Sequence, residues 1–222
     1  MDPTFIILAI AIFMLGGSGD GDDTSTTQTS TSPTGNCTAS AALVARVKAG
    51  MNGSVEARYK NGPLQAGLAP CFAAFARKYG FTNRDLAFLI GQCSLETGSF
   101  YHLTRIGATG YYQERGAIHL ATKRNFERFF SWLGLPASTN PAVINSRNDY
   151  AALTAFWYFQ NYRGPKGMTC LDIIRSNNFT ADQKIRAVSG LVNKGNMEAT
   201  ANDLARRVQK TKGAAAAMGV TL

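Results

Sequence analysis

Apolar residues recur at intervals of three and four along most of the chain after residue 40, which is the spacing of one face of an α-helix. In the clearest run, Leu89, Cys93 and Glu96 fall on one face, and the capping residue Thr82 stands ahead of the run. The pattern predicts helices over residues 41–49, 70–79, 85–96, 125–133, 148–160, 171–176, 181–192 and 199–213.

The predicted fold is mostly α, because no repeated strand–helix pattern and no internal repeat accompany these helices. One segment has a different periodicity: Ile118 and Leu120 alternate after a turn flanked by Gly110 and Gly116. This alternation favours one short β-hairpin near residues 111–121.

The N-terminal segment has a composition unlike the rest. Phe5 to Leu15 is an unbroken apolar run followed by small residues, shorter than the roughly 20 residues that span a bilayer. It predicts a secretory signal peptide over residues 1–19, with a retained anchor as the alternative because the leader lacks Lys and Arg. Residues 20–40 are rich in Ser and Thr and predict a disordered linker, which leaves 41–222 as the folded domain. We therefore expect an extracellular or cell-wall protein.

The charge is strongly uneven along the chain. The chain carries 23 basic and 14 acidic residues, and all the basic ones follow residue 40. Such an excess could attract nucleic acid or an anionic surface, but the basic residues are scattered and form no long run. We expect no nucleic-acid partner.

The four cysteines, Cys37, Cys71, Cys93 and Cys170, lack the Cys-x-x-Cys spacing of zinc sites. An even count in a secreted chain favours two disulfides, with three possible pairings. A bridge at Cys93 would stiffen the helix that carries Glu96. The alternative is a set of free, buried thiols.

Two carboxylates provide candidate chemistry. Glu96 closes the apolar helix, where burial and the helix dipole both favour the protonated carboxyl that a general acid needs. The alternative is that Glu96 lies in solvent or pairs with an arginine. Glu114 lies in a nearby Gly-flanked turn, and two such carboxylates are the minimum for glycoside hydrolysis. Aromatic residues that suit sugar faces accompany them: Phe100, Tyr101, Tyr111, Tyr112, Trp157 and Tyr158.

Five strings resemble motifs of family 19 glycoside hydrolases, which include plant-type and phage-type chitinases and endolysins. Leu95-Glu-Thr-Gly-Ser-Phe100 resembles His-Glu-Thr-Gly-Gly-Phe, and Tyr112-Gln-Glu-Arg-Gly-Ala-Ile-His-Leu120 resembles the Tyr-Tyr-Gly-Arg-Gly-Pro-Ile-Gln-Leu turn. The other three are Asn140-Pro141 with Ala155-Phe-Trp157, Val192-Asn-Lys-Gly195 and Met218-Gly-Val220. The resemblance runs from about residue 84 to 220 and implies a lysozyme-like, two-lobed helical domain with the substrate in a cleft.

The resemblance also implies roles for individual residues. Glu96 corresponds to the general acid, and Glu114 is the best candidate for the base that activates water. His119 stands where the family has a substrate-binding Gln, and Asn125 matches a sugar-binding Asn. The implied substrate-binding residues are Tyr112, Arg115, His119, Asn125, Lys166, Asn193, Glu198 and Arg207. For Lys166 and Glu198 the alternative is plain surface charge.

Three departures from the family pattern matter. Leu95 replaces its His, Ala121 replaces a Ser or Thr that holds the nucleophilic water, and the loop between the acid and the Tyr-rich turn is mostly missing. These changes are compatible with a slow enzyme, a variant mechanism or a sugar binder without activity.

The sequence as a whole predicts a secreted endochitinase that hydrolyses β-1,4 bonds between N-acetylglucosamine units with inversion. It predicts a monomer that needs no metal or cofactor and has no stable membrane insertion once the leader is removed. The alternatives are an endolysin that cleaves peptidoglycan and a non-catalytic protein that binds chitin or cell walls.

Overall fold

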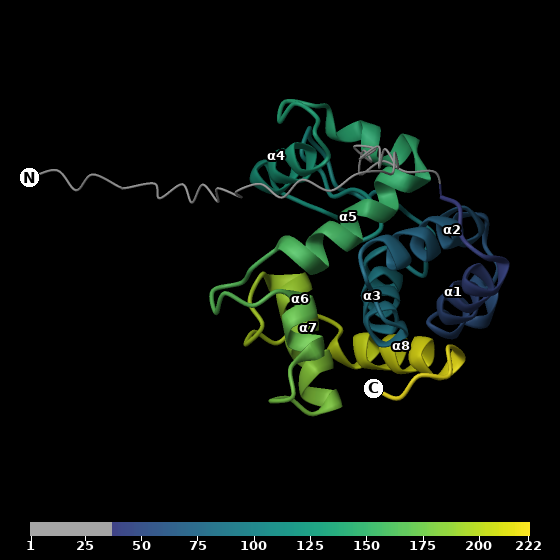
Figure 1. Ribbon diagram of the computed structural model, residues 1–222. Helices are drawn as coiled ribbons and strands as arrows, with labels where there is room; N and C mark the ends of the chain where they lie inside the picture. The colour runs from purple at the N-terminus through teal and green to yellow at the C-terminus, as the bar shows by residue number, and fades with distance from the viewer. Residues whose placement is uncertain (1–36) are drawn as a thin grey trace, which may run out of the picture. The chain divides into compact units, whose positions relative to one another are not determined.

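The computed structural model describes residues 37–222, and the predicted signal peptide and most of the predicted linker lie outside this range (Figure 1). The described part is built from helices joined by short loops. The longer helices are α1 (Ala41–Gly53), α2 (Pro63–Lys78), α3 (Asn83–Glu96), α4 (Lys123–Trp132), α5 (Asn148–Asn161), α6 (Cys170–Arg175), α7 (Ala181–Lys194) and α8 (Leu204–Ala217). Two 3-10 turns, η1 (Ala57–Tyr59) and η2 (Pro141–Ser146), complete the set.

Helix α3 is at the centre of the fold. Every residue from Asp85 to Ser94 is buried, and the helix contacts α1, α5, α6, α7 and α8. Its start is fixed by a reciprocal capping box: the Thr82 amide donates to Asp85 Oδ2 at 2.8 Å, and the Asp85 amide donates to Thr82 Oγ1 at 3.2 Å. The Arg175 guanidinium also contacts the buried Asp85 carboxylate, at 2.7 Å. The predicted cap at Thr82 is therefore present, and α3 carries Glu96 at its last position.

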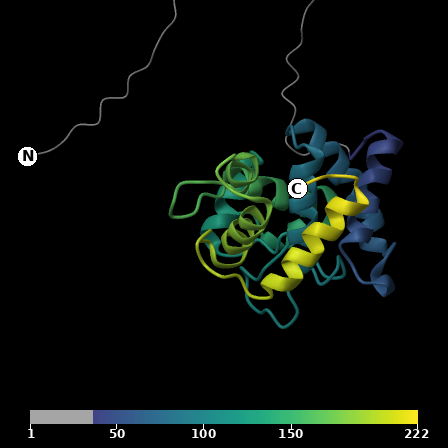
Figure 2. The ribbon, with the colours of Figure 1, turned by 90° about the horizontal axis from the view of Figure 1, so that it is seen from below.

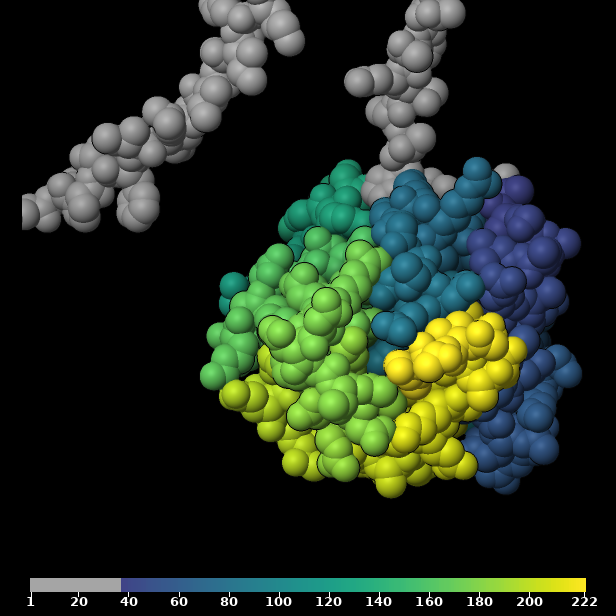
Figure 3. Space-filling model, turned by 60° about the horizontal axis from the view of Figure 1, so that its bottom comes forward, coloured from purple at the N-terminus to yellow at the C-terminus, as the bar shows by residue number. Residues whose placement is uncertain are grey.

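Helix α8 packs directly against α3 and also contacts α1 and α7. The approach is close because Gly91 of α3 has no side chain: a Cβ there would lie 2.6 Å from Thr211 Cα. Seen from below, α8 runs across the molecule between the α1–α2 pair and α7 (Figure 2). Figure 3 shows the C-terminal residues of the chain exposed on one face, between the green and blue segments. The α8 helix is therefore placed to reach the C-terminal end of α3.

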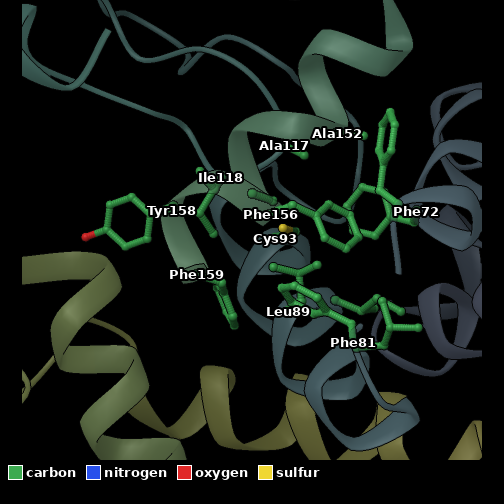
Figure 4. Close-up of a cluster of buried hydrophobic side chains, with 14 of the residues drawn as sticks. Phe72, Phe81, Leu89, Cys93, Ala117, Ile118, Ala152, Phe156, Tyr158 and Phe159 are labelled. Carbon is green, nitrogen blue, oxygen red and sulfur yellow. The ribbon is translucent and has the colours of Figure 1, made fainter. Parts of the chain in front are cut away.

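The core is rich in aromatic side chains contributed by α2 and α5. Phe156 of α5 lies 5.5 Å from Phe72, 5.9 Å from Phe75 and 4.7 Å from Phe81, measured between ring centroids. Figure 4 shows Phe156 together with Phe72, Phe81 and Cys93 of α3 in the buried cluster. All residues from Asp149 to Phe159 are buried. The edge-to-face ring contacts add to the hydrophobic burial and fix α5 against α2.

Four helix boundaries differ from the predicted ones by several residues, among them the end of α8, which lies at Ala217 and not at residue 213. Helix α1 continues to Gly53, and α2 begins at Pro63 instead of Pro70, which lies inside the helix. Helix α8 begins at Leu204, not at residue 199, because Asp203 adopts a left-handed conformation with φ of 54°. The helices over 125–133, 148–160, 171–176 and 181–192 occur within two residues of their predicted limits.

In place of the predicted β-hairpin over 111–121, the described residues contain only isolated antiparallel bridges, Thr104 with Arg115 and Arg115 with Leu120. The Arg115 amide donates to the Leu120 carbonyl at 3.0 Å, and the Leu120 amide donates back at 2.8 Å. Gly116 and His119 have φ of 80° and 50°, so the chain reverses too tightly for the ladder to continue.

The prediction of two disulfides is wrong. Cys37 and Cys71 are bonded, whereas Cys93 and Cys170 are free thiols that are fully buried in the core. Burial raises the pKa of both thiols, because the apolar interior disfavours the thiolate. Because Cys93 forms no disulfide, the helix that carries Glu96 has no covalent cross-link and is held by packing.

Among the described helices none is both long and apolar enough to cross a bilayer.

Candidate active site

A cavity of about 430 Å³ opens at the C-terminal end of α3. It brings together five of the predicted site residues: Glu96, Glu114, His119, Asn193 and Arg207. They come from α3, the 101–122 loop, α7 and α8. The other lining residues are Leu95, Arg105, Ile118, Ala121, Val192, Lys194, Asn202 and Asp203.

Glu96 lies at the wall of this cavity, with its side chain 19% exposed. Arg207 Nη2 donates to Glu96 Oε1 at 2.5 Å. The same guanidinium donates to Gln92 Oε1 at 2.7 Å and to the Asn202 carbonyl at 3.2 Å. Arg207 is 2% exposed, so this is a buried, charge-assisted contact that fixes the orientation of the carboxyl.

This contact adds a charged partner for Glu96 that the sequence did not show. The sequence showed only the apolar helix, whereas the structure places a guanidinium directly on the carboxylate. Pairing with an arginine, the alternative that the sequence left open, is the observed arrangement.

The turn that follows Glu96 has an unusual backbone. Gly98, Ser99 and Phe100 have φ of 58°, 69° and 58°, so three successive residues are left-handed. For residues other than glycine this conformation costs about 1–2 kcal/mol each. Thr97 offsets part of that cost, because its Oγ1 donates to the Cys93 carbonyl at 2.6 Å and accepts from the Phe100 amide at 2.9 Å.

A second set of contacts holds the same turn from outside. Ser99 Oγ donates to Glu56 Oε2 at 2.7 Å and accepts from Lys210 Nζ at 3.1 Å. Lys210 is 5% exposed and also donates to the Ser54 carbonyl at 3.0 Å and to Ser94 Oγ at 3.2 Å. Burial lowers the pKa of Lys210, while the Glu56 carboxylate opposes that shift. Helix α8 therefore holds Glu96 through Arg207 and the turn after Glu96 through Lys210, one helical turn further on.

Glu114 lies in the same cavity but is not free. Arg105 Nη1 contacts both Glu114 oxygens, at 3.0 Å and 3.2 Å. The Glu114 side chain is 27% exposed and the Arg105 side chain is 66% exposed. The ion pair is thus open to solvent on the arginine side, and a water could replace it at low energetic cost. Glu114 can act on a water only after one oxygen leaves Arg105.

His119 supplies a partly buried imidazole to the cavity. Its Nε2 lies 3.1 Å from the His102 carbonyl, which can only accept, so Nε2 carries the proton and donates. Burial lowers the pKa of His119, and the His102 carbonyl and the charges of Glu96 and Glu114 act in the opposite direction. The imidazole is therefore neutral at physiological pH.

This lowered pKa predicts a pH dependence of stability. In the unfolded chain His119 takes up a proton near pH 6.5, but in the folded chain only at lower pH, so acid favours unfolding below about pH 6.5. The His119→Asn variant loses this component, and Asn tolerates the left-handed backbone. Urea unfolding between about pH 7.5 and about pH 5 should show a steeper loss of stability for the wild type. Parallel curves for the two proteins would contradict the assignment.

The remaining predicted site residues lie outside the cavity lining. Tyr112 is exposed and stacks on Phe126, with ring centroids 6.0 Å apart. The Arg115 Nε is buried and has no hydrogen-bond partner within residues 37–222. Asn125 lies in the first turn of α4, where its backbone amide donates to Thr122 Oγ1 at 3.4 Å.

Lys166 and Glu198 pair with each other at 3.3 Å, and both side chains are more than half exposed. This pair joins two surface loops. For these two residues the structure agrees with the alternative of surface charge.

Asn193 has a different setting. Its Oδ1 accepts from the backbone amide of Asn202 at 2.8 Å, and this contact fixes the loop whose carbonyl binds Arg207.

Sequence reasoning missed Arg105, Lys194, Asn202 and Asp203, which line the cavity. No local pattern marks them, since each is a polar residue in or beside a loop. The departures Leu95 and Ala121 both line the cavity, so apolar side chains stand where the family motif has polar ones. Of the aromatic residues expected to face sugars, Phe100, Trp157 and Tyr158 are buried in the core.

Within residues 37–222 no cluster of three or more His, Cys, Asp or Glu side chains could hold a metal ion. The chemistry that the described side chains can provide is proton transfer by carboxyl groups and hydrogen bonding from guanidinium, amide and imidazole groups.

Comparisons with known proteins agree with this picture at the level of the fold. No protein-family model matches the sequence. Chitinase C from Streptomyces griseus superposes with a TM-score of 0.59 at 22% identity, covering 81% of this chain and 94% of that one. The family GH19, class IV chitinase from Zea mays superposes with a TM-score of 0.55 at 19% identity, covering 82% and 93%.

In sequence, Chitinase 11 of Oryza sativa subsp. japonica is 32% identical over 41% of this chain and 41% of its own length. The match thus spans about two fifths of the rice protein. These likenesses confirm the mostly helical, lysozyme-like fold that the sequence predicted.

Proposed function

We propose that this chain, which has the fold of the family 19 chitinases, is a chitinase that hydrolyses β-1,4 bonds between N-acetylglucosamine units. The observation that carries the proposal is the meeting of Glu96 and Glu114 in one cavity. They come from a helix end and from a loop, and each is oriented by an arginine. Two carboxylates in one cleft are the equipment of glycoside hydrolysis.

In the proposed mechanism Glu96 is the general acid. It donates its proton to the glycosidic oxygen as the bond to the anomeric carbon breaks. Arg207 holds Oε1, and in the described part of the chain Oε2 accepts no hydrogen bond, so Oε2 is the oxygen that faces the substrate. General acid catalysis requires that this carboxyl carry its proton when the substrate is bound.

Glu114 is the proposed base. One of its oxygens exchanges Arg105 for a water, and the water attacks the anomeric carbon from the face opposite to the leaving group. The proton of the water passes to Glu114, which gives a single displacement with inversion. Glu114 then gives this proton to solvent, and the carboxylate returns to its contact with Arg105. His119, neutral and anchored to the 102 carbonyl, supports the cavity wall beside both carboxylates.

Secretion is part of the proposal. The segment predicted as a signal peptide lies outside the described residues, and so does most of the predicted linker. The disulfide between Cys37 and Cys71 supports an oxidising compartment, since such bonds persist outside the cytosol. We also propose that the protein acts as a monomer, with no nucleic-acid partner and no stable membrane insertion once the leader is removed.

The experiment is a digestion of N-acetylglucosamine oligomers by the recombinant domain, followed by NMR of the first product. Inversion predicts that the new reducing end appears as the α-anomer and mutarotates later. A first product in the β-form would contradict the single displacement, and it would leave Glu96 as the acid in a retaining route.

A second candidate function is favoured by a specific observation. The Arg105–Glu114 ion pair, with Leu95 and Ala121 in the lining, also suits a glycan-binding protein without turnover. Tight binding of oligomers with no product over a wide pH range would decide for this function. Release of muropeptides from bacterial walls, with chitin oligomers left intact, would decide for an endolysin.

A further inference from the structure

Three segments that are far apart in the sequence meet behind the turn that follows Glu96. They are residues 54–56 after α1, residues 94–99 at the end of α3, and residues 206–210 of α8. Buried polar groups cost free energy unless they are paired, so a polar junction in the interior needs complete hydrogen bonding. Four polar residues at this junction are between 0% and 5% exposed: Ser54, Ser94, Ser99 and Lys210.

Lys210 is at the centre of this junction. Its ammonium group donates to the Ser54 carbonyl at 3.0 Å and to the hydroxyl oxygens of Ser94 and Ser99 at 3.2 Å and 3.1 Å. The Ser94 hydroxyl donates in turn to the Ser54 carbonyl at 2.9 Å. The ammonium group has three protons and three acceptors, so Lys210 has no donor left for a ligand. Its role is therefore within the protein.

Ser99 connects this lysine to a carboxylate. The Ser99 hydroxyl donates to Glu56 Oε2 at 2.7 Å, and this hydrogen bond is the main cause that lowers the pKa of Glu56. Ser99 has a φ of 69°, and the family motif has Gly at this position. A non-glycine residue in the left-handed region is strained and persists only where its surroundings restrain it. The two contacts of the hydroxyl, to Glu56 and Lys210, provide this restraint.

Close packing of α1 and α8 fixes the separation between the two groups that hold Ser99. The helices touch where both lack a side chain: a Cβ at Gly53 would lie 2.4 Å from the Gly213 carbonyl oxygen. Glu56 follows Gly53 by three residues, and Lys210 precedes Gly213 by three. The groups that hold Ser99 therefore belong to one packed unit, and the turn is fastened to that unit.

The second oxygen of Glu96 depends on this turn for its position. Arg207 fixes Oε1 alone, and a carboxyl held at one oxygen can still swing about that contact. Glu96 is the last residue of α3, so its backbone moves with the residues that follow it. The Ser99 amide donates to the Ser94 carbonyl at 2.6 Å, which joins the turn to α3 on both sides of Glu96.

We propose that Ser99, held by Lys210 and Glu56, is a positioning residue for the general acid. This rests on the proposed function, in which Glu96 transfers the proton. None of the three residues lines the catalytic cavity, so they set the direction of Glu96 Oε2 without touching the substrate. Proton transfer depends on distance and alignment, and a displacement of about 1 Å can lower a rate by about 10²-fold. The cluster therefore acts on kcat and leaves substrate binding unchanged.

The test is the Ser99→Gly variant, assayed with the N-acetylglucosamine hexamer. Glycine adopts the left-handed backbone without strain, so the variant removes the hydroxyl and leaves the turn free to move. We expect kcat to fall about 10–10²-fold while KM stays within about twofold. The assay is run at a temperature where circular dichroism shows every variant folded, so a loss of global stability does not enter kcat.

The matched control is Asn61→Gly. Asn61 is also a left-handed residue, with a φ of 58°, and its Oδ1 accepts from Asn52 Nδ2 at 2.8 Å. It lies outside the lining of the catalytic cavity. The control makes the same relief of backbone strain and the same loss of a side-chain hydrogen bond, and its kcat should equal that of the wild type.

Glu56 provides a second pair of variants. Glu56→Gln keeps an oxygen that accepts from Ser99 and should retain kcat, whereas Glu56→Ala should lower kcat by at least about twofold. In a Ser99→Gly background, Glu56→Ala should cause no further loss, because Glu56 acts through Ser99. The Glu56 side chain is 47% exposed, so we expect both variants to fold.

The outcomes separate this inference from the proposed function. A wild-type kcat in Ser99→Gly, or equal effects of Gln and Ala at position 56, would overturn the positioning role while the proposed function stands. A higher KM with kcat intact would also overturn it, since that result places the cluster in substrate binding. Absence of turnover in the wild type would overturn the proposed function, and the positioning role with it.

Discussion

Replacing Glu96 by Gln should lower turnover of chitin oligomers by roughly 10²–10⁴-fold, the size of a lost general acid. The amide oxygen can still accept the hydrogen bond from Arg207, so the side chain stays in place. The amide cannot transfer a proton to the glycosidic oxygen. We expect kcat to fall while oligomer binding changes little, as measured by a reducing-end assay and calorimetry. The thermal unfolding midpoint, followed by circular dichroism, should fall moderately, because the buried Arg207 keeps its hydrogen bond but loses its charged partner.

The matched control is Glu127→Gln, on α4. Glu127 pairs with Lys123 at 3.7 Å on the surface, so the same change in charge occurs away from the cavity. Its turnover should equal that of the wild type. Full activity in Glu96→Gln would remove Glu96 from the mechanism, whatever the control does.

Replacing Arg207 by Met should produce the largest loss of stability. Arg207 is 2% exposed and binds three acceptors, in Gln92, Glu96 and Asn202. Removing one partner of a buried ion pair costs about 3–5 kcal/mol, and here Gln92 Oε1 and the Asn202 carbonyl lose their donor as well. We expect a decrease of that size in the free energy of unfolding, measured by urea denaturation, and a loss of turnover because Glu96 is no longer oriented.

The neighbouring Arg206 provides a close control. It lies on the same helix, its side chain is 57% exposed, and it contacts Glu56 at 3.7 Å. Exposed pairs of this kind contribute about 0–1 kcal/mol, so Arg206→Met should be nearly neutral. If Arg207→Met does not fold, Arg207→Lys keeps the charge and tests the loss of the guanidinium fork alone. Equal stability losses for the Met variants at positions 206 and 207 would contradict the buried network.

The positions of most helices could be predicted from the sequence because their signals are local. Thr82, Thr169 and Thr180 each stand ahead of a helix with an Asp or Gln three residues later, and all three form capping boxes. Where the predicted helix boundaries were less accurate, contacts between residues far apart in the sequence set the observed boundaries. Helix α8 starts late because Asn193, on another helix, fixes the loop before it.

The partners of the site residues could not be predicted in the same way. Arg207 is 111 residues from Glu96 along the chain, and its contact depends on how α8 crosses α3. Arg105 resembles any other exposed loop arginine in the sequence, yet it holds Glu114. Among the aromatic residues that suit sugar faces, Trp157 and Tyr158 are buried, because α5 is enclosed on all sides.

The sequence by itself determined that the chain forms helices, where most of them begin, and that Glu96 ends one of them. These features follow from periodicity and capping, which act over a few residues. Only the tertiary structure decided that Glu96 is paired, that Glu114 is neutralised by Arg105, and that Cys93 and Cys170 stay apart. Charge pairing and burial depend on which distant segments come into contact, and that is settled by packing of the whole core.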